Sequence, residues 1–234
     1  MDNAARLAVF QAQVDNVRSL DAATRQIRRT VNEGLRRGNK PLVTVHTKVL
    51  AQVFCAWAEA NFLKVIHTPH GFTLAEMSHI RRRWKENGIT GGWETCIQLG
   101  LRKVPAKKGN FVPNARQRLN EAVQRFVTDP SLLRNKIAHG QWVSALNRGN
   151  ASINAALSTQ LAALTIVDID RWYGCHRRLA NIMESLIESP ERTFLRDYWP
   201  QLVELEEFIA VSAGWTLAVK VTGLQTKMAA REGS

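Results

Sequence analysis

The stretch from Leu42 to Ile66, LVTVHTKVLAQVFCAWAEANFLKVI, is a long and strongly apolar segment in the first third of the chain. Its first residues are β-branched, which suits a strand, but its length and its alanine-rich second half favour a helix. Pro69 and Gly71 follow and end it. The segment therefore predicts a buried helix.

The residues before this segment show helical periodicity in two blocks. Apolar side chains recur at steps of three and four from Leu7 to Val17 and again from Ile27 to Leu35. Ser19-Leu20-Asp21 lies between the blocks, and Gly38-Asn39-Lys40-Pro41 follows the second one. The pattern predicts two helices, the second ending near Gly38.

Helical patterns also fill most of the chain after Gly71. Residues 103–114 are typical of a basic surface loop, and residues 142–154 of a loop with some extended pairing. Strands that alternate with helices are missing from the pattern, so the expected fold class is all-α. Helices are expected over about 74–86, 93–102, 114–127, 129–140, 165–189, 192–199 and 200–224.

These patterns suggest how the chain is organised. We expect an N-terminal helical segment over residues 1–40, a helical bundle over 41–190, C-terminal helices over 191–225 and a flexible tail over 226–234. No internal repeat, low-complexity run or obvious linker separates these parts. One compact domain is therefore expected.

The composition describes a globular, basic protein. Hydrophobic residues make up 45% of the 234 residues, enough for a substantial core, which excludes a disordered chain. Thirty-two Lys and Arg against 20 Asp and Glu give a net charge of +12. Such a charge favours a polyanionic partner, with nucleic acid first and an anionic membrane surface second. No helix-turn-helix or zinc-finger spacing is present, so sequence-specific DNA recognition is not supported.

Two basic clusters are candidate contacts for phosphate groups. Seven basic residues and one acid lie between Arg102 and Arg125, and a second cluster surrounds residues 81–85. Residues 184–207 are acidic by contrast, with seven acids and two arginines. An isolated run of charges is more often a solvated face, but together with the net charge of +12 the clusters favour phosphate contacts. The candidate RNA-binding residues are Arg81, Arg82, Arg83, Lys107 and Lys108.

The sequence shows no sign of a metal, a cofactor or export. The cysteines at positions 55, 96 and 175 are odd in number and far apart, which predicts neither a disulfide framework nor a zinc site. His67 and His70 lack a third ligand nearby, and no Walker loop is present. The first ten residues do not resemble a signal peptide, and residues 208–219 are too few to span a bilayer. We expect a soluble cytoplasmic protein with no cofactor, no metal and no membrane association.

One segment combines side chains suited to catalysis, Asp129-Pro-Ser-Leu-Leu-Arg-Asn-Lys-Ile-Ala-His-Gly140. On a helix, Asn135 and His139 lie about 100° and 140° from Arg134, while Leu133 and Ile137 lie on the opposite side. The segment therefore predicts a core stripe and a polar arc that groups a cation, an amide and an imidazole. The alternative is that Arg134 and His139 only decorate the end of a helix, which Gly140 would terminate.

The residues Arg134-Asn-Lys-Ile-Ala-His139-Gly140 resemble the R-x4-H motif of the HEPN superfamily of helical nucleases and nucleotide-binding domains. The earlier Ala56-Trp57-Ala58-Glu59-Ala60 and the following Gln141-Trp142 are also similar to HEPN-type sequences. The resemblance implies a HEPN-like helical bundle with additional N- and C-terminal helices. It also implies metal-independent endoribonuclease activity of a toxin or anti-phage defence effector, a homodimer, and a possible antitoxin or regulatory protein.

The chemistry of metal-free RNA cleavage matches these side chains. A base must remove the proton of the 2′-OH, an acid must protonate the leaving 5′-oxygen, and positive charge must stabilise the phosphorane. Histidine suits the proton transfers and arginine suits the phosphorane. Asn135 can orient the scissile phosphate or the imidazole. Because one motif supplies one histidine, a twofold dimer that joins two motifs supplies both proton-transfer groups.

Two further residues are candidates for supporting roles. The resemblance implies that Glu59, on an early helix, holds Arg134 or fixes the tautomer of His139. The alternative is that Glu59 lies on the solvent side of its own helix. Lys136 is a candidate contact for the RNA backbone, or else an ordinary surface lysine.

Two other functions fit the same residues. A HEPN-like binding module would recognise nucleic acid or a nucleotide without cutting it. A helical partner-binding subunit would use the acidic C-terminal region and the basic middle as complementary docking surfaces.

Overall fold

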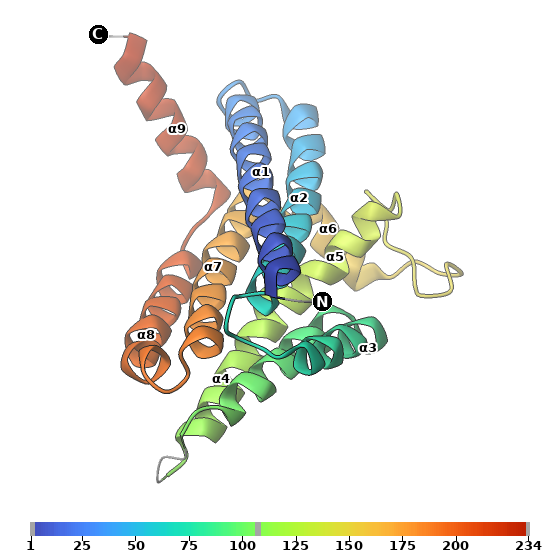
Figure 1. Ribbon diagram of the computed structural model, residues 1–234. Helices are drawn as coiled ribbons and strands as arrows, with labels where there is room; N and C mark the ends of the chain where they lie inside the picture. The colour runs from blue at the N-terminus through green and yellow to red at the C-terminus, as the bar shows by residue number, and fades with distance from the viewer. Residues whose placement is uncertain (1–2, 106–108, 233–234) are drawn as a thin grey trace.

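The computed structural model describes residues 3–105 and 109–232, and most of them are helical (Figure 1). This confirms the predicted all-α fold class. In chain order the elements are α1 (Asn3–Arg36), α2 (Lys40–Ile66), α3 (Leu74–Arg102), α4 (Phe111–Val123), the π-helical turn η1 (Gln124–Thr128), α5 (Asp129–Ala138), α6 (Ala155–Ala163), α7 (Ile166–Glu188), α8 (Thr193–Ala213) and α9 (Leu217–Glu232).

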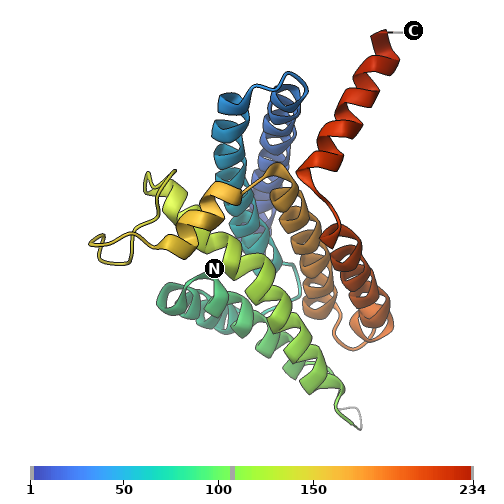
Figure 2. The same cartoon turned by 180° about the vertical axis from the view of Figure 1, so that it is seen from behind.

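The predicted buried helix is α2, which lies among α1, α5 and α7 (Figures 1 and 2). Asn39 caps its N-terminus by accepting a hydrogen bond from the backbone N–H of Leu42 at 3.1 Å. In the described part of the chain, α2 alone is long and apolar enough to cross a membrane, and 56% of its most apolar 18-residue window is buried inside the fold. That burial is typical of a core helix, and the cytoplasmic location stays a prediction.

The N-terminal segment is one helix, so the prediction of two helices is wrong. Ser19 is exposed and Leu20 is half-buried, and Asp21 accepts a hydrogen bond from Arg177 of α7 at 2.6 Å. None of the three is a strong helix breaker such as proline or glycine. Packing along α2 therefore carries the helix through the polar stretch.

α3 bends sharply where the sequence predicts an end. Gly88 has a φ of 68°, a conformation that a glycine adopts without strain, and helical geometry resumes directly after it. The predicted second helix therefore begins earlier than residue 93. Thr90 of this second half forms a hydrogen bond with Thr128 of η1 at 2.7 Å between the two hydroxyl oxygens. This contact ties α3 to the turn that precedes α5.

α4, η1 and α5 follow one another without a loop, whereas the sequence predicts a break before Asp129-Pro130. Pro130 has no N–H for a helical hydrogen bond, and its ring would clash in a regular helix interior. The wider π-helical turn takes up this irregularity, and the N–H of Asp129 bonds the carbonyl of Gln124. The predicted basic loop also ends earlier than expected, because α4 begins at Phe111.

The C-terminal half differs from the predictions at three places. α6 is not predicted by periodicity; Asn154 caps it by accepting from the N–H of Leu157 at 3.0 Å. Pro200 lies inside α8, so the predicted helix boundary between residues 199 and 200 is wrong. Proline has no N–H for the carbonyl group four residues earlier, but Pro200 is on the exposed side of the helix, where water can bond that carbonyl. The chain instead turns at residues 214–216, and α9 projects from the bundle (Figure 1). α9 also covers most of the predicted flexible tail, because residues such as Lys227 and Ala230 favour helix.

The core has two buried apolar clusters. One lies among the end of α2, α3, α4, η1, α7 and α8, and the other among α1, the middle of α2, α5, α6 and the start of α7. His176 of α7 is fully buried and packs against the rings of Phe54, Trp57 and Trp93 at centroid distances of 6.1, 5.1 and 5.6 Å. α7 therefore joins the two clusters. It begins as predicted, with the carboxylate of Asp168 accepting from the N–H of Thr165 at 2.9 Å.

Gly174 sets the approach of α8 to α7. A Cβ atom at this position would lie 2.1 Å from the ring of Phe208. We expect Gly174→Ala to lower the free energy of unfolding by about 1–2 kcal/mol, because the cost of moving the ring out of its packed position exceeds the gain of about 1 kcal/mol that alanine brings to a helix. Urea denaturation measures this change.

The matched control is Gly223→Ala in α9, where no heavy atom lies within 4 Å of the added Cβ. This change should leave stability equal or raise it by up to about 1 kcal/mol, because alanine favours helix. Equal stability of the two variants would show that Gly174 does not set the helix spacing.

Candidate functional site

The end of α5 presents the motif residues to solvent. Leu133 and Ile137 are buried, whereas Leu132, Asn135 and His139 are exposed. This confirms the predicted core stripe. Of the predicted polar arc, Asn135 and His139 are exposed, whereas Arg134 is half-buried. The exposed arc of α5 is defined here as Leu132, Asn135 and Ala138 together with the C-terminal capping residue His139.

Backbone hydrogen bonds at the end of α5 hold the main chain of His139 in position. Its N–H donates to the carbonyl of Asn135 at 3.2 Å, and the next residue, Gly140, adopts a φ of 77°. The N–H of Gln141 then donates to the carbonyl of Lys136 at 2.9 Å. These bonds form a glycine-terminated helix end, as the sequence predicts for Gly140.

Arg134 pairs with Glu59 of α2. Its Nη2 donates to Oε1 of the carboxylate, and the two side chains are 30% and 39% exposed. The Nε atom of Arg134 is buried and has no hydrogen-bond partner among the described residues. Because one carboxylate engages only part of a guanidinium with five N–H donors, Arg134 keeps the capacity to bind an anion. The structure thus brings Glu59 to Arg134, one of the two arrangements that the sequence suggests.

Cys55 lies beneath this ion pair but is not a reactive thiol. It is buried, and its Sγ atom lies 3.9 Å from the carbonyl oxygen of Pro130. Burial raises the pKa of the Cys55 thiol to about 12, although the guanidinium of Arg134 opposes the shift. A thiol that stays protonated at neutral pH is a packing residue rather than a nucleophile.

Lys136 holds the loop that follows the motif instead of extending into solvent. Its Nζ atom donates to the carbonyl of Leu146 at 2.6 Å. The side-chain oxygen of Gln141 accepts from the N–H of Leu146 at 2.7 Å, and the indole N–H of Trp142 donates to the carbonyl of Ile137 at 2.9 Å. The predicted extended pairing is present as one antiparallel bridge between Leu146 and Ile153. The position of Lys136 argues against a free contact to RNA backbone.

The arginines at 81–83 lie on the first half of α3, away from the motif helix. Arg81 and Arg82 are exposed and line an open depression of about 530 Å³ with Trp84 and Lys85. Arg83 instead pairs with Glu86 at 3.1 Å. α3 and α5 are not among the helix pairs that pack closely, so the structure does not bring this cluster together with the motif residues. The other two candidate contacts, Lys107 and Lys108, lie outside the described residues.

An open groove between α1 and α2 includes Glu59 in its lining. It measures about 470 Å³, with Gln13, Asn16 and Ser19 on one wall and Ala56 and Glu59 on the other. Periodicity alone does not reveal this groove, since it depends on how α1 crosses α2. The groove places polar side chains of α1 close to the carboxylate that holds Arg134.

No group of three or more His, Cys, Asp or Glu side chains that could hold a metal ion occurs in residues 3–105 and 109–232. Of the two neighbouring histidines, His67 is buried, with Nδ1 lying 2.8 Å from the carbonyl oxygen of Leu63, whereas His70 is exposed.

The Arg134–Glu59 ion pair has a measurable expected effect. Glu59→Gln should lower the free energy of unfolding by about 1 kcal/mol or less, because both side chains remain partly in water. The loss should shrink in 1 M salt, where charges are strongly screened. Urea denaturation at two salt concentrations tests this. Glu207→Gln, at an exposed acid in α8, is the control and should leave stability unchanged. An equal effect of both changes would mean that the pair does not hold Arg134.

Comparisons of the chain with protein-family models, with curated proteins and with solved structures found no match.

Proposed function

We propose that the protein is a metal-independent endoribonuclease of HEPN type. The observation that carries the proposal is the exposed arc of α5, with Asn135 and His139, beside an arginine that Glu59 holds in place. An imidazole, an amide and a guanidinium are the groups that phosphodiester transesterification requires. The net charge of +12 supports an RNA substrate.

The proposed reaction proceeds through an in-line attack. His139 of one protomer removes the proton of the 2′-OH, and the 2′-oxygen attacks the phosphorus. Arg134 stabilises the charge on the equatorial oxygens, and Asn135 orients one of them. The bond from phosphorus to the 5′-oxygen then breaks, and the second protomer's imidazolium protonates that oxygen. The products carry a 2′,3′-cyclic phosphate and a 5′-OH.

The proposal includes a homodimer with the two motifs facing one cleft. The exposed side chains near the motif support this arrangement, because they include apolar ones. Leu132, Val143 and Ile153 are 49%, 83% and 66% exposed. Burial of such side chains favours association, and a twofold axis would repeat the same surface on both sides of the interface.

The experiment that tests the proposal is cleavage of a labelled RNA by the purified protein in EDTA, with the product ends identified and the native mass measured. Cleavage that leaves cyclic-phosphate ends, by a dimer, is the expected result. Binding of RNA without cleavage would instead favour a HEPN-like binding module. Absence of RNA affinity at low salt would favour a helical partner-binding subunit, and the ribonuclease proposal would be wrong.

A further inference from the structure

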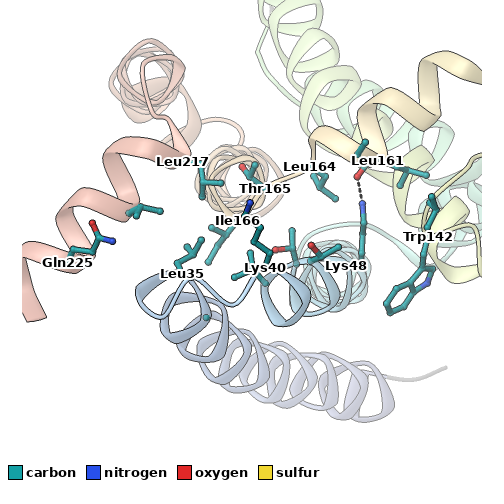
Figure 3. Close-up of a pocket in the computed structure, with 18 residues that line it drawn as sticks. Leu35, Lys40, Lys48, Trp142, Leu161, Leu164, Thr165, Ile166, Leu217 and Gln225 are labelled. Atoms are coloured by element: carbon teal, nitrogen blue, oxygen red, sulfur yellow. Dashed lines mark hydrogen bonds between the residues drawn. The ribbon is translucent and has the colours of Figure 1, made fainter.

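A cavity of about 680 Å³ lies on the side of the bundle where α9 projects (Figure 3). The end of α1, the start of α2, the junction of α6 and α7, and α9 enclose it. Its size lies within the range of small-molecule sites in proteins. Its lining is mostly apolar and includes Leu35, Trp142, Leu161, Ile166, Leu217 and Val221.

Lys48 is a buried cation in the wall of this cavity. Only 4% of the residue is exposed, and its Nζ atom donates to the carbonyl oxygen of Leu161. An ammonium group has three N–H donors. No described carboxylate forms an ion pair with Lys48, and the cavity lining contains lysines 40 and 48 but no acid. Burial lowers the pKa of Lys48.

A buried charge without a partner is costly, and proteins normally pair such charges. Asp168 in the first turn of α7 does not supply the partner, because its carboxylate accepts from the N–H and the hydroxyl of Thr165 at 2.9 and 2.7 Å. Asp170 is likewise occupied, by Arg28 and Lys220 at 2.8 Å each. A ligand can supply the missing negative charge.

We propose that this cavity binds an amphipathic carboxylate, with the carboxylate on Lys48 and the apolar part along the leucine, valine and isoleucine walls. Figure 3 indicates the orientation, since Lys48 lies toward the Trp142 end while Leu217 and Gln225 of α9 lie at the other end. The carboxylate would therefore lie near Trp142, and the apolar chain would extend toward α9.

Lys48 is the buried ammonium of the cavity, whereas Lys40 at the start of α2 is exposed to water, so a single negative charge matches the buried part of the site. Phosphate monoesters carry up to two charges and are usually met by several donors or by a bidentate arginine. The cavity lining contains no arginine, and its second cation, Lys40, is exposed at the start of α2. The mostly apolar walls also disfavour a sugar or a nucleotide. A monocarboxylate with an alkyl chain matches both the charge and the lining.

Decanoate is a suitable probe, with decanol and decylamine as neutral and cationic analogues of the same chain length. Isothermal titration should show that decanoate binds the wild-type protein most tightly. Lys48→Met should weaken decanoate binding about 10- to 100-fold, because a hydrogen-bonded charge pair is lost, and should leave decanol binding unchanged. The matched control is Lys64→Met, at a half-buried lysine outside the cavity that pairs with Glu184 at 2.5 Å. It should bind decanoate like the wild type.

A second variant and a second readout cover the case in which Lys48→Met does not fold, which circular dichroism detects. Val221→Trp on α9 should fill the cavity and abolish decanoate binding without touching the buried lysine. Because Trp142 lines the cavity, a bromine-labelled decanoate should quench its fluorescence, and Trp142→Phe should remove that quenching. Equal affinity for decanoate and decanol, or decanoate binding that survives Lys48→Met or Val221→Trp, would overturn the proposal. None of these outcomes depends on ribonuclease activity.

Discussion

His139→Ala is expected to slow RNA cleavage about 10²- to 10⁴-fold, the usual contribution of a positioned proton-transfer group. The side chain is exposed at the end of α5, so its removal should not disturb the core. In a dimer, the change removes both the base and the acid. Single-turnover cleavage of a labelled RNA in EDTA measures the loss, and RNA affinity and native mass should stay the same.

Arg134 gives the second arm of this experiment. Arg134→Ala should lower the cleavage rate by a similar factor, and Arg134→Lys should recover only part of it, because lysine lacks the planar fork that binds two phosphate oxygens. His70→Ala and Arg29→Ala change an exposed histidine and an exposed arginine elsewhere and are the matched controls. Cleavage that persists in both motif variants would locate the activity at another site.

Acid should destabilise the protein through His176. Both ring nitrogens are buried without hydrogen-bond partners among the described residues. This burial lowers the pKa of His176 to about 3. In the unfolded chain, histidine titrates near 6.5. Between these two values, only the unfolded state binds the proton, so the free energy of unfolding falls as the pH decreases. The expected loss is about 1.4 kcal/mol per pH unit below about pH 6.5, or about 2 kcal/mol at pH 5.

His176→Leu isolates this effect from the carboxylates that also titrate in acid. Leucine fills a similar volume without a titratable group, so the variant should equal or exceed the wild type in stability at pH 7. Urea denaturation from pH 7.5 to pH 4.5 should show a shallower pH dependence for His176→Leu than for the wild type. Parallel pH curves for wild type and His176→Leu would show that the imidazole is protonated inside the fold.

Local signals in the sequence identified several elements correctly. The long apolar run predicted α2, because alanine-rich apolar segments of that length form buried helices. Thr165 with Asp168 marked the start of α7, and Gly140 marked the end of α5. The angular positions of Arg134 and His139 also followed from helical periodicity. These features depend on neighbours within about one or two helical turns.

Other features depended on residues distant in the sequence. For these features, sequence patterns led either to a wrong prediction or to no prediction. Packing of α1 along α2 overrode the polar stretch at Ser19, and exposure let α8 continue through Pro200. α6 carries too short a pattern for periodicity to detect.

The candidate site shows the same contrast between features set by neighbouring residues and features set by distant ones. The sequence by itself determined that Arg134, Asn135 and His139 share one side of a helix, because helical geometry fixes the angle between residues a few positions apart. Only the tertiary structure decided that Glu59 meets Arg134 across 75 positions and that Lys48 meets Leu161 across 113. Such contacts depend on how whole helices pack, and helix packing is set by the combined shape of many side chains.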